Sequence, residues 1–322
     1  MTLTGGGIHH VTAIASDPQK NLDFFAGVLG LRLVKKTVNF DDPTTYHFYF
    51  GDELGHPGSL LTFFPWPLAH RGRQGAGQVA VTSFAIVPGA LGYWLERFIR
   101  YRVAFEQPAT RFDGERVIAF KDPDGLLLEL VAHPSAEAGD PWSDSDVPAE
   151  HSIRGIHSVT LWEEGHDRTA HLLVDHLGFR PTREQGSIYR YSSDGDGIGS
   201  IVDLRVVPGL WAGSMGAGVV HHIAFRARGS DEQLIARERL AVTGFNITPQ
   251  LDRQYFQSVY FREPGGVLFE IATDGPGFTI DESQSSLGRA LKLPPWLEER
   301  RFEIEALLPN ISPPIDMRLP YA

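Results

Sequence analysis

The chain has 322 residues, a length typical of two domains, and it contains no cysteine. Disulfides, iron–sulfur clusters, zinc–thiolate sites and cysteine nucleophiles are therefore excluded. With 40 acidic against 29 basic residues, the formal charge is -11, which argues against a nucleic-acid partner. Any bound metal must take its ligands from the 13 histidines and from aspartate or glutamate.

No apolar run reaches the roughly 18 residues that a membrane-spanning helix needs. Residues 1–7 lack the basic and apolar regions of a secretory signal. These features predict a cytoplasmic protein without a membrane partner.

A sequence unit recurs four times, at residues 7–65, 78–132, 154–207 and 218–273. Each unit begins with a strand pattern, continues into a helix pattern and ends with strand patterns, often around a turn rich in Pro and Gly. In the first unit, Asp17 can cap the helix and Gly30 can follow its end. The sequence therefore predicts an α+β fold built from four strand–helix–three-strand (βαβββ) units.

The polar segment at residues 133–150 separates the second unit from the third and predicts a domain boundary. We expect an N-terminal domain at residues 1–133, a C-terminal domain at 151–274 and a tail at 275–322. The tail carries apolar side chains that we expect it to bury while wrapping around the protein: Trp296, Phe302, Ile304, Leu307 and Leu308.

Aligning the first strands of the four units places His10, Ser83, Ser158 and His222 at one equivalent position. The equivalents on the last strands are Thr62, Glu129 and Glu270, while the third unit is too divergent to align. Only units one and four carry histidine at the first position, and only unit four adds a carboxylate. We therefore expect units one and four to pair around a single metal ion held by His10, His222 and Glu270.

Two imidazoles and one carboxylate on one face of a metal leave several positions open, an arrangement typical of non-haem Fe(II) oxygenases. A fourth protein ligand would favour isomerase or hydratase chemistry, but the aligned position holds Thr62, whose neutral hydroxyl is a poor ligand. A single His-His pair in a strand is often structural, and His157, which aligns with His9, fits packing or hydrogen bonding better. Two such pairs at equivalent places, together with Glu270, favour the metal site.

Five segments resemble a known family: GIHHVTAI from Gly7, YHFYFGDELGHPGSLLTFFPWP from Tyr46, VVHHIAF from Val219, LDRQYFQSVYFREPGGVLFEIATDGPGF from Leu251 and LPPWLEERR from Leu293. They are similar to the vicinal oxygen chelate superfamily, which includes glyoxalase I, bleomycin-resistance proteins and extradiol ring-cleaving dioxygenases. The closer resemblance is to the hydroquinone-cleaving dioxygenases, typified by chlorinated-hydroquinone dioxygenase, and it covers nearly the whole chain.

The resemblance implies that His10, His222 and Glu270 bind Fe(II), with Mn(II) also compatible. It implies a small aromatic diol of the hydroquinone type as substrate, together with O2, both atoms of which are inserted. It also implies active-site roles for five further residues: His9, Thr12, His221, Arg253 and Tyr260.

For these side chains, a role in binding the substrate competes with an ordinary structural role. Tyr260 would bind a substrate oxygen, and Arg253 would hold an anionic oxygen; cross-strand packing and a surface salt bridge are the alternatives. Strand alternation predicts that His9 and His221 point away from the ligands beside them. A five-residue turn after Arg262 predicts that Tyr260 pairs with Glu270 on one face.

Two other function classes stay open. A non-redox glyoxalase-like isomerase or lyase is one, and Thr62 counts against it. A metal-free protein that binds an aromatic compound is the other, and the intact ligand set counts against that. Catechol cleavage is a variant of the first hypothesis, but the usual catechol-cleaving relatives take ligands from units three and four, where this chain has Ser158. Self-association and the ring substituents are left open.

Overall fold

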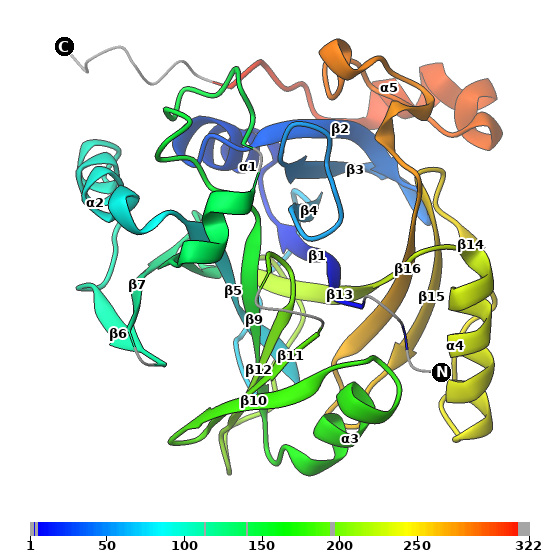
Figure 1. Ribbon diagram of the computed structural model, residues 1–322. Coiled ribbons are helices and arrows are strands. Elements are labelled where there is room, and N and C mark those ends of the chain that lie inside the picture. The colour runs from blue at the N-terminus through cyan, green and yellow to red at the C-terminus, as the bar shows by residue number, and fades with distance from the viewer. Residues whose placement is uncertain (1–2, 4–5, 113, 140, 194–196, 315–322) are drawn as a thin grey trace.

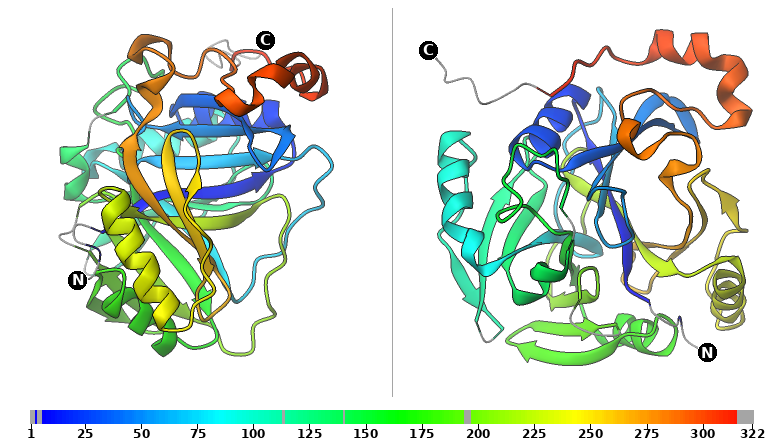
Figure 2. Two further views of the ribbon diagram at one scale, coloured as in Figure 1. Left: turned by 90° about the vertical axis from the view of Figure 1, so that its right-hand side faces the viewer. Right: turned by 45° about the horizontal axis from the view of Figure 1, so that its top comes forward.

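The computed structural model describes residue 3 and residues 6–112, 114–139, 141–193 and 197–314. Its strands form two curled eight-stranded sheets with helices on their outer faces (Figures 1 and 2). Within these residues no helix combines the length and the apolar character needed to cross a lipid bilayer. The α+β fold of repeated units is confirmed.

The first sheet joins unit one to unit four, in the strand order β14-β15-β16-β13-β1-β4-β3-β2. Unit one contributes β1 (Ile8–Ala15), β2 (Arg32–Asn39), β3 (Asp42–Gly51) and β4 (Leu60–Pro65). Unit four contributes β13 (Val219–Ala227), β14 (Leu251–Asp252), β15 (Phe256–Arg262) and β16 (Leu268–Pro276). Because β1 and β13 are antiparallel neighbours, the predicted pairing of units one and four is confirmed.

The second sheet joins units two and three, in the order β10-β11-β12-β9-β5-β8-β7-β6. Unit two contributes β5 (Gln78–Ile86), β6 (Ala109–Arg111), β7 (Glu115–Lys121) and β8 (Leu127–Ala132). Unit three contributes β9 (Ile156–Glu163), β10 (Arg180–Gln185), β11 (Ile188–Ser192) and β12 (Ile201–Val206). Each sheet thus takes strands from both halves of the sequence, and the division into domains at 1–133 and 151–274 stays a prediction.

A helix follows the first strand of every unit: α1 (Pro18–Leu22), which continues as a π-helical turn at Asp23–Val28, α2 (Leu91–Arg100), α3 (Asp167–Asp175) and α4 (Ser230–Val242). Asp17 caps α1 by accepting hydrogen bonds from the backbone of Gln19 and Lys20. Gly30 adopts a φ of 68° after this segment, a conformation that glycine adopts without strain. Both sequence signals for the first helix are therefore confirmed.

The helices cover one face of each sheet because strand residues alternate in direction. On β1, Val11 and Ala13 are fully buried in the main hydrophobic core together with Phe25 of the first helical segment. The alternate residues, His10 and Thr12, face the concave side of the sheet. Buried polar side chains accumulate on the concave side of each sheet.

The tail after β16 lies against β2 and β3 of unit one and includes α5 (Arg301–Leu307) (Figure 1). Short 3₁₀ turns occupy Phe278–Ile280, Gln284–Ser286 and Pro295–Arg300 in the tail, as they do at Pro88–Ala90 and Pro134–Ala138 earlier in the chain. Ile304 and Leu308 are buried as expected, and Trp296 is 48% exposed. The expectation is wrong for Phe302 and Leu307, which are 90% and 55% exposed, because this short helix buries only one face.

Candidate metal centre

The two His-His pairs lie at β-bulges in the central strands of the first sheet. Along the β1–β13 ladder, Ile8 pairs with Phe225 and His10 with Ala224, so His9 is an extra residue in β1. The second irregularity lies between Thr12, which pairs with His222, and Ala13, which pairs with Val220, so His221 is an extra residue in β13. Bulges locally re-aim side chains, and these two turn His10 and His222 toward one another.

Glu270 reaches the same point from β16, which runs parallel to β13 and pairs Ala224 with Glu270. The Nε2 atoms of His10 and His222 are 3.3 Å apart. Glu270 Oε2 lies 3.3 Å from His10 Nε2 and 2.9 Å from His222 Nε2. All three side chains are at least 95% buried.

These separations fit three neighbouring ligands of one metal ion. Ligands about 2.1 Å from a metal, at right angles to one another, lie about 3.0 Å apart. Glu270 Oε2 is buried without a hydrogen-bond partner among the described residues, so it is an acceptor aimed at the centre of this group. The predicted ligands therefore converge, and their donor atoms match the two-histidine, one-carboxylate pattern.

The protonation states also suit a cation. Burial alone would raise the pKa of Glu270, but the imidazoles of His10 and His222 hold it well below its usual value. Burial lowers the pKa of His222. The site thus presents an ionised carboxylate and neutral His222, the forms in which these groups bind metals.

His9 and His221 each support the ligand that follows them. His9 Nδ1 lies 2.9 Å from His10 Nδ1, and His221 Nδ1 lies 2.8 Å from His222 Nδ1. Burial lowers the pKa of both His9 and His221 to about 3, so both are neutral at ordinary pH. A ligand histidine that keeps Nε2 free for a metal carries its proton on Nδ1 and can donate it to the neighbouring ring.

The prediction that His9 and His221 point away from the ligands is wrong. The His9 and His10 rings both lie beside the Phe256 ring, with centroids 5.1 and 5.2 Å from it. The physical reason is the bulge at each of these residues, which interrupts the two-residue alternation of a regular strand.

Tyr260 pairs with Glu270 across the β15–β16 hairpin, so the predicted register is confirmed. Arg262 pairs with Leu268, which leaves the five residues 263–267 in the turn. The Tyr260 ring packs edge-on against the His222 ring, with centroids 5.8 Å apart. Burial and the negative charge of Glu270 raise the pKa of Tyr260, so its hydroxyl stays protonated.

Arg253 lies at the edge of the site and makes the salt bridge considered for it, while its contact with an anionic oxygen stays a prediction. Its guanidinium carbon is 5.4 Å from the centre of the Tyr260 ring. The same group pairs with Asp41, at 3.0 and 3.2 Å. Thr12 completes the predicted set: it is fully buried and lies directly across the ladder from His222.

Three side chains near the centre were not predicted. Ser258 donates a short hydrogen bond to Glu270 Oε1 and so orients the carboxylate. Its position two residues before Tyr260, on the same strand face, is a signal that could have identified it. His47 and Tyr49, on β3, lie behind Thr62; in the sequence they look like one more alternating aromatic strand.

The second sheet corrects the alignment of unit two. In each unit one residue of the first strand pairs with a residue of the last strand. The pairs are Thr12 with Thr62 in unit one, Ser83 with Glu129 in unit two, Thr160 with Asp203 in unit three and Ala224 with Glu270 in unit four. Ser83 is therefore the equivalent of Thr12, and Val81 stands at the position of His10. Asp203 supplies the equivalent that the third unit lacked in the sequence alignment. The predicted position of Ser158 agrees with this register.

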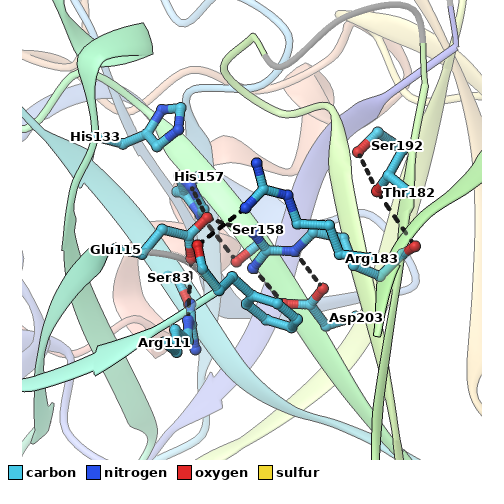
Figure 3. Close-up of polar contacts among 12 residues, drawn as sticks. Ser83, Arg111, Glu115, His133, His157, Ser158, Thr182, Arg183, Ser192 and Asp203 are labelled. Atoms are coloured by element: carbon cyan, nitrogen blue, oxygen red, sulfur yellow. Dashed lines mark hydrogen bonds and ion pairs between the residues drawn. The ribbon is translucent and has the colours of Figure 1, made fainter. Parts of the chain in front are cut away.

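The concave side of the second sheet holds ion pairs (Figure 3). Arg190 binds Asp203 through two contacts of 2.8 Å and also binds Glu115. Arg111 pairs with Glu129 at 2.8 Å and with Glu115 at 3.3 Å.

Glu115, His133 and His157 lie within ligand distance of one another, but the two guanidinium groups already neutralise Glu115. Positive charge at this point repels a further cation. The same charge contributes, after burial, to a pKa of His157 well below normal. His157 belongs to this ion-paired cluster, and among the described groups the first sheet holds the better metal site.

Comparison with known proteins agrees with this fold. A family model described as the Glyoxalase/Bleomycin resistance protein/Dioxygenase superfamily matches residues 7–130 and 155–271. The chain is 48% identical over 304 residues to MhqO of Bacillus subtilis, named as a ring-cleaving dioxygenase, covering 94% of this chain and 96% of that protein. It is 36% identical over 319 residues to the chlorohydroquinone/hydroquinone 1,2-dioxygenase of Sphingobium indicum, with coverages of 96% and 97%.

A solved structure extends the similarity to three dimensions. The crystal structure of a Bacillus subtilis protein named as a dioxygenase superimposes with a TM-score of 0.92 at 46% identity. The match covers 97% of this chain and 99% of that one. The chain therefore belongs to the glyoxalase, bleomycin resistance protein and dioxygenase superfamily, and within it to the ring-cleaving dioxygenases.

Proposed function

We propose that the protein is an Fe(II)-dependent dioxygenase that cleaves the ring of a hydroquinone-type aromatic diol and inserts both atoms of O2. The observation that carries the proposal is the convergence of His10 Nε2, His222 Nε2 and Glu270 Oε2 at 2.9–3.3 Å in a buried site. The name of the Sphingobium relative supports the substrate class.

His10, His222 and Glu270 would hold the metal. Bound Fe(II) would supply open positions for a substrate oxygen and for O2, and the electrons that dioxygen activation needs. The Glu270 carboxylate offsets one of the two positive charges, and Ser258 holds that carboxylate in place. Mn(II) accepts the same donor atoms.

Aromatic side chains around the site suit a flat ring. Phe256 lies beside His10, and Phe64 packs edge-on against His221 with ring centroids 5.7 Å apart. Planar ligands gain both apolar contact and ring stacking from such surroundings.

The polar groups of the site would orient the oxygens of the substrate. Tyr260 keeps its proton and can donate a hydrogen bond to a substrate oxygen. Arg253 carries a permanent charge that can hold a phenolate, or the carboxylate that ring opening produces. His9 and His221 keep the ligand rings oriented through their Nδ1 contacts.

A glyoxalase-like isomerase is the second candidate, and the structure gives one reason against it. Such chemistry is favoured by a fourth protein ligand, and Thr62 occupies the equivalent position. The Thr62 hydroxyl is engaged by Thr12 and His47 at 2.7 and 3.0 Å, and it is neutral.

Oxygen consumption separates the candidates. The protein is loaded anaerobically with Fe(II), mixed with hydroquinone or catechol, and then exposed to O2. We expect O2 uptake in a one-to-one ratio with ring-opened product, and greater with hydroquinone than with catechol. Bound iron without uptake on any aromatic diol contradicts the proposal and favours the isomerase, while a protein that retains no metal favours a binding protein.

A further inference from the structure

A chain of buried hydrogen bonds leads from the metal centre into the core of unit one. Thr12 Oγ1 lies 2.7 Å from Thr62 Oγ1, which lies 3.0 Å from His47 Nε2. His47 Nδ1 in turn lies 2.9 Å from the Tyr49 hydroxyl oxygen. None of the four side chains is more than 9% exposed.

The near end of this chain lies beside the ligands. Thr12 is two residues after His10 on the same strand face, and it pairs directly with His222. Thr62, the next member, holds the position that Glu270 holds in unit four.

The far end fixes the direction of the hydrogen bonds. Tyr49 is 1% exposed and sits among apolar residues. Burial raises the pKa of Tyr49 well above normal, so its phenol keeps its proton. A buried hydroxyl hydrogen needs an acceptor, and among the described residues the partner of this hydroxyl is His47 Nδ1.

The donor and acceptor of each further hydrogen bond then follow from the one before it. Burial, together with the charges of His10 and His222, holds the pKa of His47 well below normal, so its ring carries one proton. With Nδ1 accepting from Tyr49, that proton is on Nε2 and is donated to Thr62. Thr62 then donates to Thr12, so the hydroxyl hydrogen of Thr12 remains for a further acceptor.

We propose that Tyr49, His47 and Thr62 are positioning residues that fix Thr12 as a hydrogen-bond donor to a substrate oxygen at the metal centre, and that the site thereby favours the deprotonated, phenolate form of the substrate. A hydrogen bond to a charged acceptor is stronger than one to a neutral hydroxyl. The identity of the ligand rests on the proposed function, whereas the direction of the chain does not.

The tautomer of His47 tests the direction without any turnover. Nitrogen-15 NMR of the full-length protein, labelled in histidine, distinguishes a protonated from an unprotonated ring nitrogen. The His47 signal is identified by its absence from the spectrum of the His47→Gln variant. We expect the proton on Nε2 and an accepting Nδ1, and a proton on Nδ1 would overturn the proposal.

A matched pair of variants at Thr62 tests the effect on binding. Thr62→Val removes the hydroxyl but keeps the branched shape, whereas Thr62→Ser keeps the hydroxyl. Anaerobic titration of the Fe(II)-loaded proteins with hydroquinone, followed by the ultraviolet absorption of the phenolate, gives the affinity and the apparent pKa of the bound phenol. We expect Thr62→Val to bind the phenolate about 10-fold to 100-fold more weakly, with a higher pKa of the bound phenol, and Thr62→Ser to stay near wild type.

These outcomes distinguish a failure of the proposed hydrogen-bond chain from a failure of the proposed function. Equal behaviour of Thr62→Val and wild type, with iron content unchanged, contradicts the positioning role even if the enzyme consumes O2. Absence of O2 uptake by wild type, with the expected His47 tautomer, contradicts the proposed function and leaves the direction of the chain intact. The tautomer measurement decides the direction if Thr62→Val does not fold.

Discussion

The carboxylates Glu270 and Glu129 occupy equivalent positions in the two sheets but have opposite surroundings. Glu270 faces the imidazoles of His10 and His222, which can share a cation with it. Glu129 faces the guanidinium of Arg111 and accepts a hydrogen bond from Ser83. A carboxylate that is already paired with an arginine has little to offer a metal, so the neighbours decide the role of each carboxylate.

Glu270→Gln should therefore abolish metal binding, while Glu129→Gln should leave it intact. The amide keeps the shape of the side chain but removes the charge that holds the cation. Metal content after dialysis, measured by elemental analysis, should fall at least about 10-fold in Glu270→Gln. Wild type and Glu129→Gln should hold one ion per chain; equal loss of metal in both variants would contradict the assignment of the ion to the first sheet.

Tyr260→Phe should slow turnover about 10-fold to 100-fold while leaving the metal content unchanged. The variant keeps the ring that packs against His222 and loses only the hydroxyl. The comparison of kcat with iron content checks this expectation. Full turnover in the variant would leave Tyr260 with a packing role alone.

Sequence reasoning brought together the three converging side chains because repetition places His10, His222 and Glu270 in comparable strands. It missed the orientation of His9 and His221 because a bulge is a single-residue irregularity without a clear local signal. It also missed His47 and Tyr49, whose importance depends on the cross-strand neighbour Thr62 rather than on their own spacing.

Among the elements, strand β2 carries the contact that anchors the tail. Lys35 is fully buried, and its ammonium group lies 2.6 Å from Asp281 and also binds Glu282. The segment that follows β16 is thus fastened to unit one by charge as well as by the apolar contacts of α5. The wrapping of the tail was predictable from its apolar residues, but this ion pair was not, because a lysine within a strand gives no sign of burial.

Lys35→Met should lower the free energy of unfolding by about 3–5 kcal/mol, because it leaves two buried or half-buried carboxylates without their cation. Urea unfolding followed by circular dichroism measures the change. Lys20→Met, at an exposed position of α1, serves as the control and should change the stability by less than about 0.5 kcal/mol. A loss as small as in the control would show that the tail is held by its apolar contacts.

Over the whole molecule, a buried carboxyl group of the second sheet packs against a turn of the first sheet. Glu163, at the end of β9, packs against the turn between β15 and β16: a Cβ added to Gly265 would lie 1.8 Å from Glu163 Oε2. Burial raises the pKa of Glu163 from 4.5 to about 8, and the negative charge of Glu263 acts in the same direction. Glu163 is therefore protonated in the folded protein at neutral pH.

This raised pKa predicts a loss of stability with rising pH. Because the folded state binds the proton more tightly than the unfolded state, the contribution of Glu163 is fully present below pH 4.5 and is lost as the pH rises through 8. Glu163→Gln, which cannot ionise, should therefore lose less thermal stability than wild type between pH 5 and pH 9. Melting temperatures across this range check the expectation, with exposed Glu164→Gln as the control; parallel curves for all three proteins would contradict it.

The pairing of units one and four was predictable because only these units carry a histidine, His10 or His222, at the first aligned position. The contact of Glu163 with the distant turn was not predictable, because no sequence pattern links β9 to the turn at 263–267. The alignment of unit two failed by two residues for a related reason: register is set by bulges and neighbours that only the folded sheet displays.

The adjacency of β1 and β13 has a consequence for the order in which the protein matures. His10 and His222 are 212 positions apart along the chain, and Glu270 follows later still. During synthesis, the edge of β1 that pairs with β13 therefore stays unpaired until nearly the entire polypeptide has left the ribosome. The strands of units two and three are available earlier, so His10, His222 and Glu270 come together only late in synthesis.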